Sequence, residues 1–97
     1  MNDRLHLVYQ HDPNIVSRLI GGEMILVPIR QNVGDMEHIY TLNATAARIW
    51  ELIDGKRSLA EIQQLVVQEF EIDDLQAQAD LFDLVESLLE QGALLLV

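Results

Sequence analysis

The sequence predicts an α+β domain that is winged-helix-like, with a three-stranded antiparallel sheet followed by three helices. Two observations predict this class. Short β-branched runs separated by glycine and turn residues fill the first half, and longer capped runs with helical apolar spacing fill the second half. Because strands and helices are segregated, the helices are expected to cover one face of a small sheet. At 97 residues, of which 49% are hydrophobic, the chain is expected to form a single domain, residues 1–97, around one core.

The strands are expected near residues 15–20, 24–29 and 37–42. The first two are rich in β-branched residues and flank Gly21 and Gly22, which predicts a hairpin. Turn chemistry over residues 31–35 separates the hairpin from the third strand. Residues 1–13 are expected to be a flexible N-terminal segment or to contribute a strand, and the pattern leaves both open.

The helices are expected near residues 44–54, 59–69 and 74–91. Asn43 is a favourable N-cap for the first helix, and Gly55 stands where a left-handed residue ends it. Ser58 and Glu61 have the spacing of a capping box, which predicts the start of the second helix. The final run, 93–97, is apolar and is expected to be either a last strand or a segment packed on the core.

Trp50 is the chain's only tryptophan and is expected to anchor the core. Four residues of the first helix share one apolar face at helical spacing: Ala46, Ile49, Trp50 and Ile53. Small residues at 46 and 47 would allow a close approach of this helix to the sheet. Burial as a structural anchor is therefore favoured over a role for Trp50 as a ligand platform.

Charge and composition exclude several functions. The formal net charge is −10, and beyond Arg57 the chain has nine carboxylates and no Lys or Arg. Because phosphate contacts need cationic side chains, no nucleic-acid partner is expected. The chain has no cysteine, and its three histidines lie on no metal-ligand spacing, so no metal, cofactor or catalytic residue is expected and the chain is not predicted to be an enzyme. The absence of a signal peptide and of a long apolar run predicts a cytoplasmic protein with no membrane contact.

The run LNxTAAxIWxLxDG over residues 42–55, followed closely by the capping-box helix SLAEIQQLV, resembles the signature of the PqqD family. The resemblance covers roughly residues 13 to 97. Members are small peptide chaperones, also called RiPP recognition elements, that hold the leader of a ribosomally made precursor peptide and present it to a modifying enzyme, often a radical S-adenosylmethionine (radical SAM) protein. The resemblance implies a non-catalytic chaperone whose partners are a precursor peptide and such an enzyme.

Two features depart from members devoted to pyrroloquinoline quinone (PQQ) biosynthesis. Those members tend to carry a cysteine before the Asp-Gly pair, where this chain has Ile53, and the turn before the third strand is longer here. The resemblance therefore implies the peptide-binding module and leaves PQQ biosynthesis open beside related peptide-modification pathways.

The resemblance implies that the peptide site lies between the third strand and the third helix. An extended peptide can add to an exposed strand edge, with backbone hydrogen bonds for affinity and side-chain pockets for specificity. The third helix carries an inner apolar stripe that should face the core and a second stripe, here called the outer stripe, which is either a wide core stripe or the floor of a groove. The resemblance favours the groove. The expected peptide-binding residues are Glu37, His38, Ile39, Tyr40 and Thr41 of the strand, and Gln78, Phe82, Val85 and Leu89 of the outer stripe.

Two other functions remain as alternatives, a winged-helix DNA-binding regulator and a general protein–protein adaptor. The acidic third helix argues against the regulator. An exposed sheet edge would also allow a strand-paired or swapped homodimer.

Overall fold

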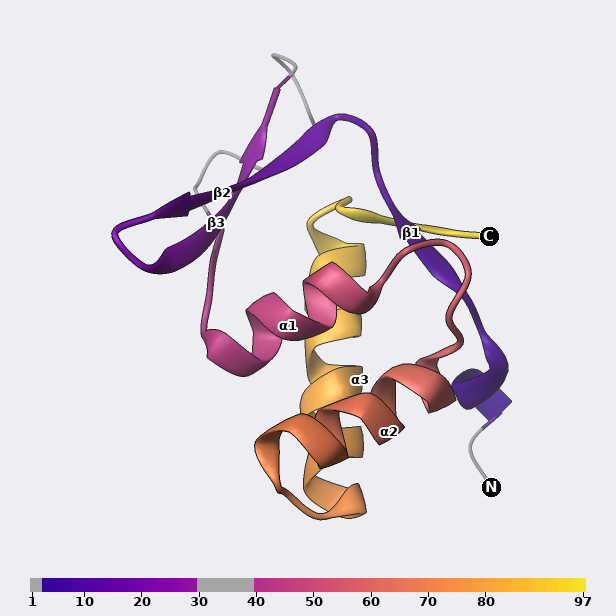
Figure 1. The fold of residues 1–97 in the computed structure, drawn as a ribbon. Coiled ribbons are helices and arrows are strands. Elements are labelled where there is room, and N and C mark those ends of the chain that lie inside the picture. The colour runs from indigo at the N-terminus through magenta and orange to yellow at the C-terminus, as the bar shows by residue number, and fades with distance from the viewer. Residues whose placement is uncertain (1–2, 30–39) are drawn as a thin grey trace.

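The computed structural model describes residues 3–29 and 40–97, and it confirms the α+β class with a three-stranded antiparallel sheet and three helices (Figure 1). The elements in chain order are η1 (Asp3–His6, a 3₁₀ helix), β1 (Tyr9–His11), β2 (Ile15–Ile20), β3 (Glu23–Pro28), β4 (Tyr40–Leu42), α1 (Ala44–Leu52), α2 (Leu59–Phe70), α3 (Asp74–Glu90) and β5 (Leu94–Leu96).

The three-stranded sheet has the order β2–β3–β4, with both pairs antiparallel. Gly21 and Gly22 have φ of 58° and 83°, so both central residues of the hairpin turn adopt the left-handed conformation that glycine tolerates best. The hairpin is therefore confirmed. The third strand is described from Tyr40 onward, and residues 37–39 lie outside the described part of the chain.

A second sheet joins the two ends of the chain. β1 pairs with β5 in antiparallel register, with Tyr9 opposite Leu96, and the Asp12 amide donates to the Ala93 carbonyl at 2.9 Å. The sequence leaves two alternatives for the N-terminal segment, residues 1–13, and for the final run, residues 93–97, and each contributes a strand. Neither run is long or strongly alternating by itself, and each becomes a strand because the other supplies its hydrogen-bonding partner.

The helices begin at the expected caps. The Asn43 side chain accepts from the Ala46 amide at 2.8 Å, and Ser58 and Glu61 form the reciprocal capping box. Asp73 caps α3 by accepting from the Gln76 amide. α1 ends slightly earlier than expected, at Leu52, and Gly55 follows with φ of 80°.

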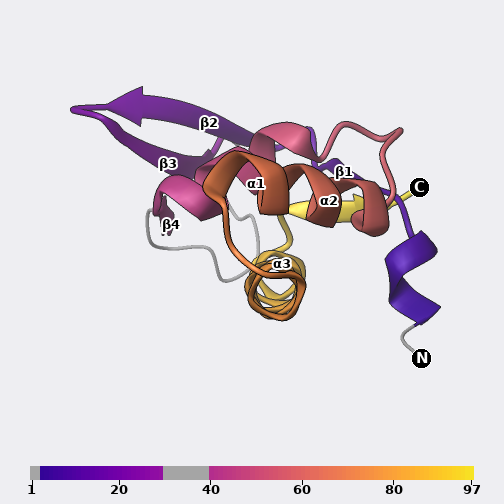
Figure 2. The ribbon, with the colours of Figure 1, turned by 60° about the horizontal axis from the view of Figure 1, so that its bottom comes forward.

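The core lies where α1 meets both other helices and the sheet (Figures 1 and 2). Trp50 is 2% exposed, which confirms its expected burial. The His11 ring stacks on the Trp50 ring with centroids 3.6 Å apart, so β1 closes one side of the anchor. In the described ranges, no helix has the length and apolar character to cross a membrane.

A groove between β4 and α3

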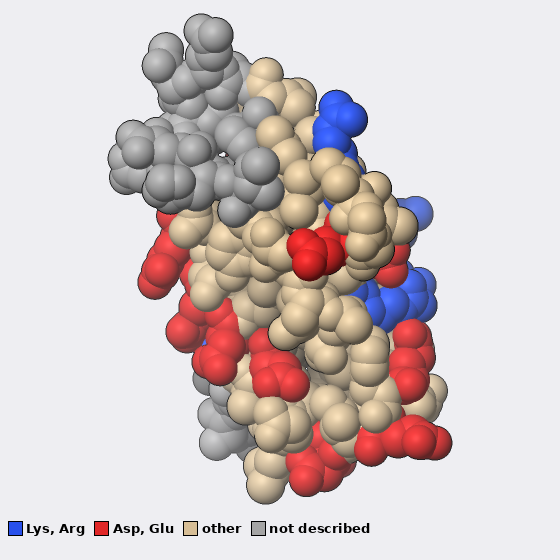
Figure 3. Space-filling view, turned by 90° about the vertical axis from the view of Figure 1, so that its left-hand side faces the viewer, with Lys and Arg blue, Asp and Glu red and all other residues tan. Residues whose placement is uncertain are grey.

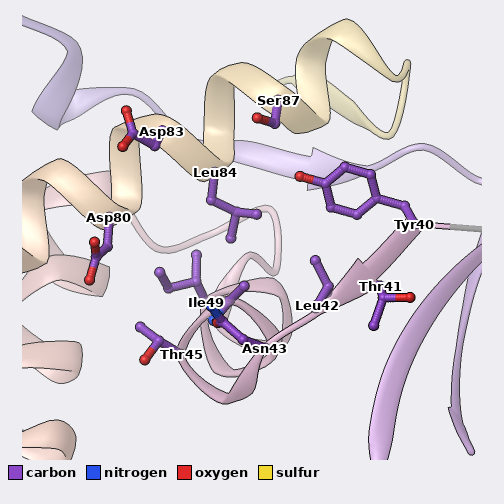
Figure 4. Close-up of a pocket in the computed structure, with 11 residues that line it drawn as sticks. Tyr40, Thr41, Leu42, Asn43, Thr45, Ile49, Asp80, Asp83, Leu84 and Ser87 are labelled. Atoms are coloured by element: carbon purple, nitrogen blue, oxygen red, sulfur yellow. The ribbon is translucent and has the colours of Figure 1, made fainter.

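A cavity of about 320 Å³ opens between β4, the first half of α1 and α3 (Figure 4). It is called the β4–α3 groove below. Its lining residues are Tyr40, Thr41, Leu42, Asn43, Thr45, Ala46, Ile49, Asp80, Asp83, Leu84 and Ser87. Leu42, Ile49 and Leu84 are buried and give the groove an apolar floor. Polar side chains from α1 and α3 form its rim.

The strand side of the groove is an available sheet edge. β3 occupies one edge of β4, and among the described residues no strand pairs with the other. Tyr40 is half-buried, and its ring extends from β4 toward α3 in Figure 4, whereas Thr41 is exposed. Two expected site residues, Tyr40 and Thr41, are therefore brought together with α3. Glu37, His38 and Ile39 lie outside the described residues.

The helix side of the groove differs from the expected one. Asp80, Asp83, Leu84 and Ser87 line it, at the i, i+3, i+4 and i+7 spacing of a single helix face. At about 100° per residue, this face and the outer stripe lie on roughly opposite sides of the α3 axis. The expectation that the outer stripe floors the groove is therefore not met: Gln78, Phe82, Val85 and Leu89 are absent from the lining.

The N-terminal segment packs against part of the outer stripe. The Arg4 guanidinium lies 4.3 Å from the centre of the Phe82 ring and donates to the Glu86 carboxylate at 2.9 Å. Val85 is 3% exposed and belongs to the core, Gln78 is half-buried, and Leu89 is 42% exposed. The alternative reading of the outer stripe as a wide core stripe fits Val85 and Phe82. Whether these four residues contact a peptide stays a prediction, and their position moves the site toward the other side of α3.

The face of α3 that lines the groove carried a weak signal in the sequence. Asp80, Asp83 and Ser87 are polar and look like an ordinary solvated helix face, and Leu84 is apolar and looks like a core residue. The outer stripe is apolar, so the sequence pattern favours the side of α3 that carries it, whereas the groove borders the other side. Sequence spacing fixes which residues share a face, but the sheet's position decides which side of α3 borders β4.

The groove contains chemistry for binding. Its polar groups are carboxylates, hydroxyls, an amide and the available backbone of β4. In residues 3–29 and 40–97 there is no group of three or more His, Asp or Glu side chains placed to hold a metal ion. What the arrangement offers is an edge for backbone hydrogen bonds beside an apolar floor, which is the combination used in strand addition.

This fold and groove define a small domain with an open sheet edge beside a helix, and comparison with known proteins assigns the family. The family model described as "Coenzyme PQQ synthesis protein D (PqqD)" matches residues 23–94. The chain belongs to the PqqD family, which confirms the resemblance seen in the sequence. Comparison with curated proteins gives no match.

Two solved structures are similar over nearly their whole length. One is described as the lasso peptide synthetase B1 complexed with the leader peptide; it is 29% identical, with a TM-score of 0.74, and the match covers 90% of this chain and 96% of that one. The other is described as TbiB1 in complex with the TbiA(beta) leader peptide; it is 24% identical, with a TM-score of 0.72, and the match covers 88% of this chain and 93% of that one. The second likeness supports the fold alone.

Proposed function

We propose that this protein is a non-catalytic peptide chaperone that binds the leader of a ribosomally made precursor peptide as an added strand on β4. It then presents the precursor to a modifying enzyme, a radical SAM protein or another peptide-modifying enzyme. The observation that carries the proposal is the edge of β4 beside the apolar floor of the β4–α3 groove. Membership of the PqqD family and likeness to a protein described as the lasso peptide synthetase B1 complexed with the leader peptide, which is 29% identical, support it.

Strand addition fits the dimensions of the site. A strand added to β4 would lie about 4.7–4.9 Å from it and place alternate side chains on opposite faces. Side chains on the same face as Tyr40 and Leu42 would point toward α3 and cover the apolar floor. Main-chain hydrogen bonds would supply affinity for many sequences, while the floor would select apolar side chains at alternate positions. Such a site suits a leader segment that binds in an extended form.

PQQ biosynthesis and related peptide-modification pathways both remain compatible with the proposal, and a cytoplasmic location fits a partner made on ribosomes. The DNA-binding alternative gains nothing from the structure, because α3 carries no Lys or Arg along its whole length.

The test uses random 12-residue peptides displayed on phage and selected on the immobilised full-length protein. The tightest peptide is then titrated into isotope-labelled protein while amide shifts are followed. We expect the shifted amides to include Tyr40, Thr41 and the groove face of α3. Shifts confined to the β2–β3 hairpin or to α2 would contradict the proposal.

A variant that blocks the groove tests the same site by the affinity of the peptide, without mapping amide shifts. Ser87 is half-buried in the groove wall, so Ser87→Trp should fill the groove and weaken the selected peptide about 10-fold or more, equivalent to roughly 1.4 kcal/mol. Gln64→Trp is the matched control, because Gln64 is exposed on α2 outside the groove. Equal binding by both variants would place the peptide elsewhere.

A further inference from the structure

The β4–α3 groove has an acidic wall. Asp80 and Asp83 stand on α3 and face the cavity, and none of its eleven lining residues is Lys or Arg. Figure 3 shows acidic side chains spread over this face of the molecule, at its left, lower and right margins, whereas the Lys and Arg side chains lie on the right. A peptide entering the groove would therefore meet an apolar floor and a negative wall.

The described cations do not neutralise this wall. The Asp80 carboxylate accepts from the Gln76 side-chain amide at 2.8 Å, which leaves its charge in place. Within the described ranges, ion pairs involve Glu86, Glu51, Glu69 and Asp54, and none involves Asp80 or Asp83. The two carboxylates are one helical turn apart on the same face, so a single cation between them would relieve their mutual repulsion.

We propose that the peptide segment bound on β4 carries a lysine or arginine whose side chain crosses the groove to Asp80 and Asp83. The inference rests on the proposed function and names the chemistry of its ligand. A long side chain is needed, because the added strand lies on the β4 side and the carboxylates stand on α3. Lys and Arg combine an apolar stem, which suits the floor formed by Leu84 and Ile49, with a charged end group.

The position of the basic residue within the segment also follows. Figure 4 shows Ser87 on the Tyr40 side of the groove and Asp80 on the Thr45 side. The basic side chain therefore belongs at the end of the added strand near Asn43, where β4 passes into α1. An apolar side chain two residues away along the segment, on the same face of the added strand, would lie nearer Tyr40.

A structural role for the carboxylates gives a different expectation. α1 begins at Ala44 and has no acidic residue in its first turn, so Asp80 near Thr45 could complement the positive end of the α1 dipole. In that case, Asp80→Asn would lower the melting temperature and leave peptide preference unchanged. The protein's net charge of −10 offers another route, a general attraction for basic peptides that does not depend on these two residues.

The experiment repeats the random 12-residue selection on three full-length proteins: the unmodified chain, Asp80→Asn/Asp83→Asn, and Asp80→Lys/Asp83→Lys. We expect Lys or Arg to be enriched at one position with the unmodified chain, to lose that enrichment with the neutral variant, and to be replaced by Asp or Glu with the reversed variant. The matched control is Glu71→Gln/Glu90→Gln, which removes the same charge from two exposed residues outside the groove. It should keep the enrichment.

One selected peptide is then used to measure the coupling between its basic residue and the carboxylates of Asp80 and Asp83. Replacing its enriched lysine by norleucine, or its arginine by methionine, should weaken binding to the unmodified chain about 10-fold and to the neutral variant less than about 2-fold. Peptides that shift the amides of Tyr40–Leu42 but show no basic preference would overturn this inference and leave the proposed function standing. A basic preference that survives in the neutral variant, or disappears in the control, would also overturn it. If no selected peptide shifts β4 amides, the proposed function fails and the inference fails with it.

Discussion

The helical body, formed by α1, α2 and α3, packs most of its apolar side chains into the core, whereas the tip of the β2–β3 hairpin exposes them. In α1, Ile49 and Trp50 are at most 2% exposed, whereas Leu19 and Ile20 at the hairpin tip are 70% and 58% exposed. The hairpin projects from the body and is anchored at its base, where Ile15 and Leu26 are buried (Figure 1). Stability is therefore concentrated in the body, while the sheet contributes backbone edges, including the one proposed to receive a peptide.

Trp50 should give the largest effect if the body holds most of the folding free energy. It is almost fully buried, stacks with His11 and lies beside Ile49 and Ile53 of the same core. Trp50→Ala should lower the free energy of unfolding by about 3–5 kcal/mol, as other large-to-small core changes do. Chemical denaturation followed by far-UV circular dichroism measures it. A loss below about 1 kcal/mol would show that the body does not depend on its anchor.

The capping box tests a smaller contribution within the body. The Ser58 hydroxyl accepts from the Glu61 amide at 3.2 Å, and the Glu61 carboxylate accepts from the Ser58 amide at 2.9 Å. Ser58→Ala should cost about 1 kcal/mol by leaving the first turn of α2 without its cap. The same measurement on Gln64→Ala, an exposed position inside α2, serves as the control and should change little. Equal effects would mean that the cap is replaced by water without cost.

The same comparison explains what the sequence could predict. Ser58, Asn43 and the Gly21–Gly22 turn act through neighbours a few residues away, so local patterns located their elements well. β1 and β5 were left open because Tyr9 and Leu96 pair across almost the whole chain. The groove face of α3 was missed for a related reason: Asp80 and Asp83 become groove residues only once β4 is placed beside them. Tyr40 and Thr41 line the groove as expected, and that expectation comes from the family resemblance to this strand and not from local spacing.

His11 connects the N-terminal strand to the body and should make stability depend on pH. Its Nε2 donates to the Trp50 carbonyl at 2.7 Å. Burial lowers the pKa of His11 below its ordinary value of 6.5, and the hydrogen bond to Trp50 partly opposes this. The unfolded chain therefore binds the proton more readily, so stability should fall as the pH drops from above 6.5 through the lowered pKa, and this contribution should level off below it.

The measurement for His11 is the melting temperature between pH 8 and pH 5. His11→Phe preserves a ring against Trp50 but cannot titrate, so the slope over this range should become shallower in the variant. The carboxylates of Asp54 and Glu69 also have lowered pKa values, through hydrogen bonds from Arg57 and Arg48 respectively. The stability that they contribute to the protein is lost only when they are protonated, at a more acidic pH than the range used for His11. An unchanged slope in His11→Phe would remove His11 as the cause.

A change at Leu19 should have the smallest effect on the free energy of unfolding, and it tests whether the hairpin tip is as exposed in solution as it is in the structure. Its side chain is exposed in the folded chain and in the unfolded chain, so Leu19→Ser removes little burial and should change the free energy of unfolding by no more than about 0.5 kcal/mol. A loss above about 1 kcal/mol would mean that the hairpin tip is covered in solution. Measuring the melting temperature at two protein concentrations identifies the cover: if a second copy supplies it through the sheet edge, stability rises with concentration in the unmodified chain and ceases to do so in Leu19→Ser. If stability is independent of concentration in both, the tip is a free apolar surface and the hairpin's contribution to folding lies at its base.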